Sequence, residues 1–455
     1  MPNSSSQEST GTFWLPSEHV READRVLGTI ETTSDEVKLT LQGHAVFNQV
    51  ELLPEMRRKW EKRVVGTIAT ATYVDISDCR RIGVQVYTVG GPPEVTFKVR
   101  GPILVSSDPH LVDPDPPLAH ELQFEVEGLA EWFARPLGHP IPQHPWGMGR
   151  PLDSPPSVEA TCDQRACTAR IGEGVSLSLR NHLYWGDKGF FDLRIRQATV
   201  ATISSSDLVE PTALIDLANC FTDFIRFMSG EDCHARGLVF YNHDRKLADE
   251  SHTDRRVGMG LMKPNPQHRL QGWGDMLVHQ RDIAGHETKI LERWFRLHAE
   301  KRYAVGLLDW IMTSGTRPDA AIVLTVGAIQ KLVTRNNRRG QKHQYERFLR
   351  DSGLDAWGVD VTAMSERLAE LRNMPAHGDP LPAERGALET FWFVVAAMRV
   401  YFLRRIGFTE EQCHRIAIRH RGLREALKLP TPEADWNKMN SRGWIMNGVG
   451  TGEDC

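Results

Sequence analysis

Cysteine and long apolar runs are scarce in this sequence. Seven cysteines occur in 455 residues, scattered and odd in number, which is typical of reduced thiols and not of a disulfide framework. The longest apolar run, Phe391 to Met398, is far shorter than the ~20 residues that a membrane-spanning helix needs. Residues 1–10 are polar and serine-rich, without the apolar core of a secretory signal. We therefore expect a cytoplasmic protein with no membrane partner.

Motifs for metals and for nucleotide phosphates are also lacking. Cys162 and Cys167 are separated by four residues and Cys233 adjoins His234, whereas structural zinc sites usually show tighter paired spacing. The glycine-rich fragments around Gly258 and Gly448 neither follow a predicted strand nor open a helix with Lys-Ser/Thr. We expect no metal and no cofactor.

Charge is distributed unevenly along the chain. Residues 286–428 hold 24 Lys and Arg against 17 Asp and Glu, an excess of seven positive charges, while the whole chain carries −4. The remainder therefore carries −11. A basic carboxy-terminal half beside an acidic amino-terminal half is expected if the former binds a polyanion, although a solvated basic face explains the same excess.

The amino-terminal half shows mostly period-two alternation, as in Val37 to Leu41, where apolar and polar residues alternate. We predict a disordered lead-in over residues 1–11 and a β-rich domain over residues 12–242, with a sandwich or barrel-like architecture. The other predicted strands are 67–76, 83–89, 95–99, 122–126, 175–179, 191–195 and 237–241.

One helix is predicted within this half, because Leu214, Phe221, Ile225 and Met228 fall on one face and Gly230 can terminate it. Two stretches rich in Pro, Gly and His are predicted surface loops, and a polar segment is a predicted connection between domains. These are residues 108–117, 135–156 and 243–280, respectively.

The carboxy-terminal half is predicted to be an all-α helical bundle over residues 281–428, followed by a tail over 429–455. In the clearest helix, Phe391, Val395, Met398 and Phe402 recur at three- and four-residue steps and Gly407 can cap the end. The fold class is thus α+β multidomain. The predicted helices are 286–313, 319–335, 341–352, 361–373, 385–406 and 410–426.

A motif of the form R-N-x-x-x-H precedes this helix, with Arg372, Asn373 and His377 as its fixed residues. The bare Arg/His spacing means little, because it also occurs at Arg281/His286, Arg293/His298, Arg338/His343 and Arg415/His420. Only Arg281 and Arg372 are followed directly by a short polar residue.

Position favours the Arg372 motif over the other pairs. Arg293/His298 and Arg415/His420 fall inside predicted amphipathic helices, where a five-residue step points side chains apart and surface positions are expected. His286 opens the first helix and borders the connection. Pro375, in contrast, is expected to interrupt helical hydrogen bonding between Arg372 and His377 and to bend the chain, bringing both groups toward one centre.

These residue types suit the cleavage of RNA without a metal. The reaction uses the 2′-hydroxyl as nucleophile and needs a base, an acid for the departing 5′-oxygen and a cation for the phosphate. His377 can transfer protons near neutral pH. Arg372 can grip the phosphate through its fork of donors, and Asn373 can orient the phosphate or the imidazole.

The sequence resembles two known groups. The motif ahead of a helix ending Val400-Tyr401-Phe402-Leu403-Arg404-Arg405-Ile406-Gly407 resembles the HEPN superfamily (higher eukaryotes and prokaryotes nucleotide-binding). Gly11-Thr12-Phe13-Trp14-Leu15-Pro16, followed by Leu27-Gly28-Thr29-Ile30 and the Val37 to Leu41 strand, is similar to the start of ApeA-type anti-phage proteins. Those proteins couple such an amino-terminal domain to a HEPN ribonuclease.

The resemblance implies an abortive-infection effector that cleaves host RNA, with tRNA the leading substrate, after an unidentified phage trigger is sensed by the amino-terminal domain. It carries the catalytic positions onto Arg372, Asn373 and His377. One motif supplies one imidazole, whereas the reaction asks for a separate acid and base. We therefore expect a homodimer through the helical domain, with two motifs facing each other across its axis.

Two other hypotheses belong to different classes. The helical domain can be a catalytically silent dimerisation or nucleotide- or RNA-binding module in a defence or toxin-antitoxin system, with Arg372 and His377 holding a bend or contacting phosphate. Alternatively, the β-rich half carries an unrelated activity, although no nucleophile, base or metal cluster converges there in the sequence.

Overall fold

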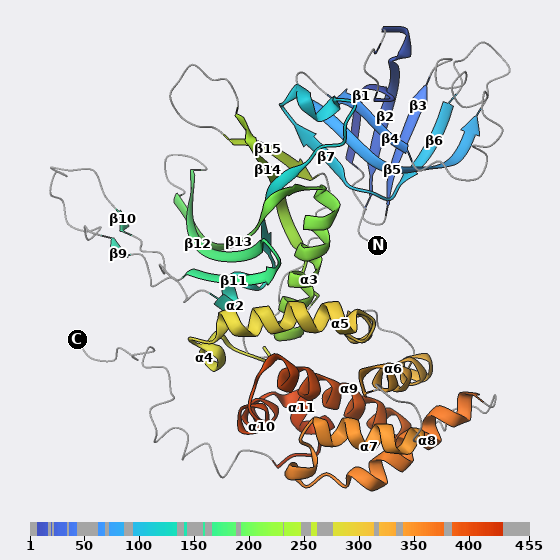
Figure 1. The fold of residues 1–455 in the computed structure, drawn as a ribbon, viewed down its shortest axis with the longest axis vertical. Coiled ribbons are helices and arrows are strands. Elements are labelled where there is room, and N and C mark those ends of the chain that lie inside the picture. Colours follow the sequence, from blue (N-terminus) through green and yellow to red (C-terminus); the bar gives the residue numbers. More distant parts are fainter. Residues whose placement is uncertain are drawn as a thin grey trace, which may run out of the picture. The chain divides into compact units, whose positions relative to one another are not determined.

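The computed structural model describes residues 7–16, 20, 22–33, 36–42, 62–68, 72–85, 94–133, 141–142, 158–159, 166–187, 193–230, 232–246, 256–261, 276–313, 318–333, 340–376 and 385–430. The chain forms two compact units. The first contains Met1–Thr222 and Cys233–Leu270, and the second contains Asp223–Asp232 and Gln271–Cys455. The strands drawn in Figure 1 belong to the first unit, together with the helix labelled α2 and most of α3, and the helices labelled α4 to α11 belong to the second.

The first unit is built from antiparallel strands. Thirteen of the described strands form one sheet in the order β11-β12-β13-β8-β14-β15-β7-β5-β4-β1-β2-β3-β6, and β9 pairs with β10 separately. The strands are β1 Gln7–Trp14, β2 Val26–Thr32, β3 Val37–Gln42, β4 Lys62–Ile68, β5 Thr72–Gln85, β6 Glu94–Val99, β7 Ile103–Ser106, β8 Ala119–Val126, β9 Ile141–Pro142, β10 Val158–Glu159, β11 Ala166–Gly172, β12 Val175–Asp187, β13 Leu193–Val209, β14 Ala235–Lys246 and β15 Arg256–Leu261.

Part of this sheet closes into a barrel. The first half of β5 pairs with β4 and its second half pairs with β6, so the order β5-β4-β1-β2-β3-β6 returns to its start. Phe13, Ile30 and Phe97 are fully buried in the core of this barrel. Gly66 leaves room for the Phe13 ring, because a Cβ there would lie 2.6 Å from it. The sequence predicted a sandwich or a barrel-like architecture, and the barrel is confirmed for this part of the sheet. Its two outer strands, β5 and β6, pair with each other and so close the ring.

The helix predicted in this half is α3, Pro211–Ser229. It begins at a proline, which needs no amide partner in the first turn, and ends at Gly230, whose φ of 76° suits glycine. The Gly230 amide donates to the Arg226 carbonyl at 2.7 Å. Phe221 packs edge-on against Phe124 of β8, with ring centroids 6.1 Å apart. The short helix α2, Leu129–Phe133, follows β8.

Three expectations for this half are corrected. The predicted disordered lead-in contains β1 from Gln7 onward, which pairs with β2 and β4. The predicted strand over 67–76 spans the end of β4 and the start of β5. The predicted connection over 243–280 contains β15, which pairs with β14 and β7. Hydropathy patterns do not reveal strands with many polar side chains. Such strands are stabilised by backbone hydrogen bonds, which do not depend on the side chains.

The predicted loops differ in outcome. Residues 109–112 of the first loop form the 3₁₀ helix η3, Pro109–Val112, which Asp108 caps by accepting from the His110 amide at 3.0 Å. The second loop, 135–156, lies outside the described residues except for β9. Another 3₁₀ helix, η1 Glu22–Asp24, precedes β2.

The second unit is helical, which confirms the predicted fold class of a β-rich region followed by an all-α region. Its central helix is α9, which contacts α5, α6, α7, α8, α10 and α11 and is buried from Phe393 to Leu403. The described helices are α4 Gln280–Ile283, α5 Glu287–Thr313, α6 Pro318–Val333, α7 Gln341–Asp351, η5 Asp355–Trp357, α8 Val361–Ala376, α9 Arg385–Ile406, α10 Glu410–Arg419 and α11 Arg421–Ala426.

Most predicted helices lie within a few residues of those observed, and two differ in shape. The predicted helix over 410–426 is two helices, because His420 leaves the helical conformation and its Nδ1 accepts from the Leu423 amide at 3.1 Å. This imidazole cap allows α11 to begin directly after His420, so a single residue separates α10 from α11. Helix α5 is kinked at Lys301, where φ is −132°.

Candidate functional site

The predicted motif lies at the carboxy-terminal end of α8. Arg372 is half-buried and Asn373 is exposed, and Arg372 Nη1 donates to Asn373 Oδ1 at 3.3 Å. Leu368 and Leu371 are fully buried, so they fix the face that α8 turns toward the bundle and leave Arg372 at the edge of that face. His377 lies outside the described residues, so the structure brings together the first two predicted site residues only.

The bend expected at Pro375 does not occur before the end of α8. The helix continues through Pro375 to Ala376, three residues beyond its predicted end. A proline removes the hydrogen bond to the carbonyl four residues earlier. In the last turn this loss concerns a single bond, and the neighbouring bonds keep the turn helical.

Among the described residues, the guanidinium of Arg372 has no acidic partner. Its one hydrogen bond within the described residues is the contact with Asn373, and no carboxylate in that part of the chain forms an ion pair with it. By comparison, Arg367 on the same helix contacts Glu370 at 3.4 Å and Arg419 contacts Asp282 at 2.6 Å. A half-buried cation without a carboxylate can bind a phosphate through two parallel donors.

The other Arg/His pairs are separated or have structural roles. Arg293 and Arg415 are exposed, as expected for helix surfaces, but both partner histidines are half-buried. His298 Nε2 lies 3.1 Å from Asp223 Oδ2, and His420 caps α11. The expectation of surface positions is therefore wrong for these two histidines. The imidazole of His298 contacts Asp223, and that of His420 accepts from the Leu423 amide. Of the remaining pairs, the Arg281 side chain and Arg338 are outside the described part.

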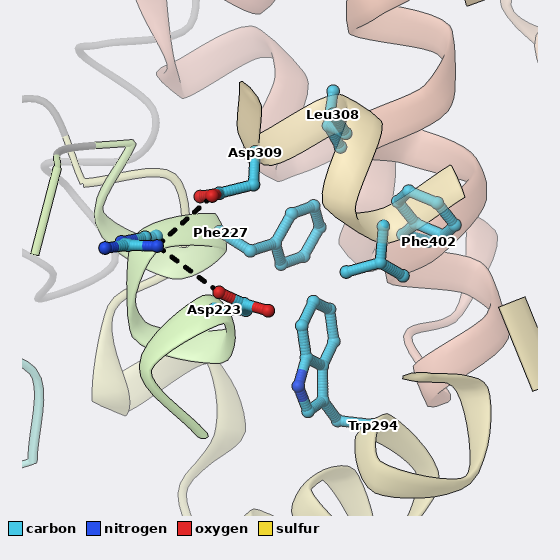
Figure 2. A pocket seen from close by; sticks show the side chains of 8 residues that line it. Asp223, Phe227, Trp294, Leu308, Asp309 and Phe402 are labelled. Atoms are coloured by element: carbon cyan, nitrogen blue, oxygen red, sulfur yellow. Dashed lines mark hydrogen bonds and ion pairs between the residues drawn. The ribbon is translucent and has the colours of Figure 1, made fainter. Parts of the chain in front are cut away.

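Sequence reasoning missed a second cluster, in which the end of α3 packs against α5 and α9. Phe227 stacks on Trp294 with ring centroids 5.3 Å apart and meets Phe402 edge-on at 6.1 Å. Figure 2 shows these three rings pointing toward one another beside the acidic side chains. The three rings line a small pocket, which Leu308 also lines. No sequence pattern links α3 to these helices, because the contacts join segments that are distant in the chain.

Charged groups surround the aromatic contacts. Arg226 lies 3.2 Å from Asp309, 3.4 Å from Asp223 and 3.4 Å from Asp232. Burial raises the pKa of Asp309, and the neighbouring carboxylates add to this while Arg226 opposes it. Because Arg226 and His298 engage Asp223, this cluster joins the end of α3 to α5, and its carboxylates are occupied by internal contacts.

Helix α9 also satisfies the length and composition of a membrane span over Gly386–Ile406, with a mean hydropathy of 1.4. Within the second unit, however, 78% of its most apolar window is buried. Core helices of helical bundles have the same composition.

The comparison with protein families identifies the class of protein. Residues 8–294 match the family described as ApeA N-terminal domain 1. The match covers more than half of the chain and includes the barrel from Glu8 onward and the rest of the thirteen-stranded sheet. No curated protein and no solved structure matches the chain.

The chain therefore belongs to the ApeA N-terminal domain 1 family. This family places it among ApeA-type anti-phage defence proteins, as the residues at its amino-terminal end indicated. The matched region reaches the start of α5 and so leaves α6 to α11 outside it.

Proposed function

We propose that this protein is an abortive-infection effector whose helical unit cleaves host RNA, with tRNA the leading substrate, after phage infection is sensed. The observation that carries the proposal is the half-buried Arg372 at the end of α8, which no carboxylate neutralises within the described residues. The ApeA membership supports the defence role. The resemblance of the motif to HEPN ribonucleases supports the chemistry.

The roles of the three residues follow from the reaction. Arg372 binds the scissile phosphate and stabilises the negative charge that grows on it. Asn373, whose side chain is exposed beside Arg372, orients the phosphate or the imidazole. His377 either removes the proton from the attacking 2′-hydroxyl as a base or gives a proton to the departing 5′-oxygen as an acid. The products are a 2′,3′-cyclic phosphate and a 5′-hydroxyl, and no metal or cofactor takes part.

A complete site needs two copies of the chain. General acid and general base must both be present at one phosphate, and each motif contributes one imidazole. A two-fold homodimer through the helical unit places two motifs at one site. Full cleavage by a monomeric chain, or cleavage that needs added Mg²⁺, contradicts this arrangement.

The decisive experiment compares the wild type with His377→Ala in cells. We expect the wild type to inhibit growth and to create new RNA ends with cyclic phosphates, which sequencing of RNA ends detects, and His377→Ala to abolish both. His414→Ala is a matched control, because His414 lies on α10 against Trp357. Both variants are checked for folding and dimerisation.

The alternative is a catalytically silent module that binds RNA or nucleotide and dimerises. An arginine without a carboxylate partner among the described residues also suits such a role, because phosphate binding requires no proton transfer. If folded, dimeric His377→Ala retains the growth inhibition of the wild type and neither protein produces new RNA ends, the silent module is correct.

A further inference from the structure

A buried arginine lies in the core of the helical unit. Arg399 belongs to the central helix α9 and is buried there. Its Nε and Nη2 are both enclosed, and neither has a hydrogen-bond partner in the part of the chain that the structure describes. These two nitrogens carry the parallel N–H groups along one edge of the guanidinium, which together can bind two oxygens of a carboxylate or a phosphate. The edge that suits an oxyanion is therefore the edge without a partner among the described residues.

The charge of Arg399 is not compensated by any described neighbour. Burial is the one cause that lowers the pKa of Arg399 to about 10, and no described carboxylate acts on it. A charge that is buried without a partner is costly, so buried charges are normally paired. The half-buried Arg419 of the same unit is paired in this way, because its Nη1 and Nη2 donate to the two oxygens of Asp282 at 2.9 and 2.6 Å.

The end of α3 lies beside the guanidinium. Nη2 of Arg399 is next to Gly230, where an added Cβ would be 3.2 Å away. The helix dipole of α3 favours a cation at this end. The nearby carbonyls have other donors, however, since the Arg226 carbonyl accepts from the Gly230 amide. The Met228 carbonyl accepts from the Val278 amide. The dipole explains why a cation lies here, but it provides no hydrogen-bond acceptor for the guanidinium.

We infer that Arg399 binds a compact oxyanion, a phosphate or a carboxylate group, against the last turn of α3. Nε and Nη2 donate to two oxygens of the ion, and Gly230 has no side chain to occupy the space beside Nη2. Asp223–Asp232 and α9 belong to the same unit, so the bound ion links them and stabilises the helical unit. The inference goes beyond the proposed function and does not depend on RNA cleavage.

The test combines thermal unfolding with phosphate binding by the purified full chain. In a buffer free of phosphate and carboxylates, Arg399→Met should melt above the wild type, because the buried charge is then unpaired. Inorganic phosphate at constant ionic strength, at about tenfold its Kd, should raise the Tm of the wild type by about 3–6 °C. The advantage of the variant should shrink accordingly. Isothermal titration calorimetry should show one phosphate bound per wild-type chain and none per Arg399→Met chain.

Arg405→Met is the matched control, because Arg405 also belongs to α9 but is exposed. Phosphate stabilises many proteins through its exclusion from their surface, so the informative quantity is the rise in Tm of the wild type minus that of each variant. This difference should be near zero for Arg405→Met. Arg399→Lys keeps the charge and removes the paired donors, and its Kd for phosphate should be roughly tenfold weaker. It also replaces Arg399→Met in the comparison if the latter does not fold.

Acetate in place of phosphate distinguishes the two sources of the oxyanion. Binding of phosphate alone assigns a phosphorylated ligand, binding of acetate alone assigns a carboxylate, and binding of both shows that the site accepts either group. Each of these results supports the site if Arg399→Met abolishes the binding. The absence of saturable binding of both ions to the wild type, or equal binding by Arg399→Met, would overturn the inference.

Discussion

Asp75 is a buried carboxylate of the barrel, and its cationic partner, Arg63, also binds three backbone carbonyls. Arg63 Nε donates to Asp75 Oδ2 at 2.7 Å, while its other nitrogens donate to the carbonyls of Leu111, Asp113 and Pro114. Burial raises the pKa of Asp75 to about 6, and the charge of Arg63 opposes the rise. The side chain of Asp75 is 3% exposed. A single shared cation therefore does not compensate the loss of water around this carboxylate.

Because the pKa of Asp75 is raised, Asp75 should contribute more to the stability of the first unit at acidic pH than at neutral pH. The folded state binds the proton more tightly than the unfolded state, so the contribution is complete below pH ~3.8 and is lost as the pH rises through about 6. The loss amounts to roughly 3 kcal/mol. Asp75→Asn should flatten this part of the dependence in thermal unfolding scans between pH 4 and pH 8.

The exposed Asp115 provides the control for this measurement, because Asp115→Asn also removes one carboxylate from the first unit. The informative quantity is the melting temperature of the wild type minus that of each variant. For Asp75→Asn we expect this difference to grow as the pH falls. A difference that is constant across the pH range would show that Asp75 does not titrate as described.

Among the helices, α9 holds a buried charge in the core of the second unit, and no acidic side chain of the described residues forms an ion pair with it. Arg399 is 8% exposed, and its Nε and Nη2 have no hydrogen-bond partner in the described part of the chain. Burial lowers the pKa of Arg399 to about 10, which leaves it charged at neutral pH. Its Nη2 lies beside Gly230 at the end of α3, where an added Cβ would be 3.2 Å away.

Replacing this arginine by an apolar side chain should stabilise the helical unit. Arg399→Met keeps a long side chain and removes a buried charge, for which we expect a gain of about 1–4 kcal/mol, measured as a higher melting temperature. Arg405→Met on the exposed side of α9 is the control and should change stability by less than about 0.5 kcal/mol. A lower melting temperature for Arg399→Met would show that an anionic group pairs with Arg399.

At the scale of the whole molecule, the division into units passes through α3. Residues up to Thr222 belong to the first unit, whereas Asp223–Asp232 belong to the second. The second unit also includes the segment before α4, where the Val278 amide donates to the Met228 carbonyl at 3.2 Å and Arg419 Nη2 donates to the Leu277 carbonyl at 3.2 Å. The predicted boundary at residue 281 therefore omits parts of the helical core.

A chain that begins at residue 281 should be markedly less stable than one that begins at Pro211. The shorter chain lacks Phe227, and loss of a buried phenylalanine alone typically costs about 3–5 kcal/mol. Circular dichroism melts of both purified proteins test this. Phe227→Ala in the full chain should lower the helical transition similarly, while Tyr303→Ala, which removes a side chain of a residue that is 59% exposed, should not. If the chains that begin at residues 211 and 281 had the same melting temperature, the assignment of Asp223–Asp232 to the second unit would be contradicted.

The sequence determined most of the helical unit, because its patterns are local. The stripe of Phe391, Val395, Met398 and Phe402 predicted α9 with both ends correct, and the Gly230 stop of α3 was also confirmed. Period-two alternation likewise indicated strands and a sandwich or barrel-like architecture, of which the structure has the barrel. Arg372 and Asn373 were placed on α8 by the same reasoning, while the end of that helix was not, since one proline in a last turn does not break it.

Only the tertiary structure decided the relations between distant segments. The ring closure of β5 with β6, the pairing of β15 with β7 and the insertion of Phe227 between Trp294 and Phe402 have no local signal. The hydrogen bond from Gln330 of α6 to Tyr345 of α7 is of the same kind. Local periodicity records which face of an element is apolar, whereas the choice of partner depends on the packing of all elements at once.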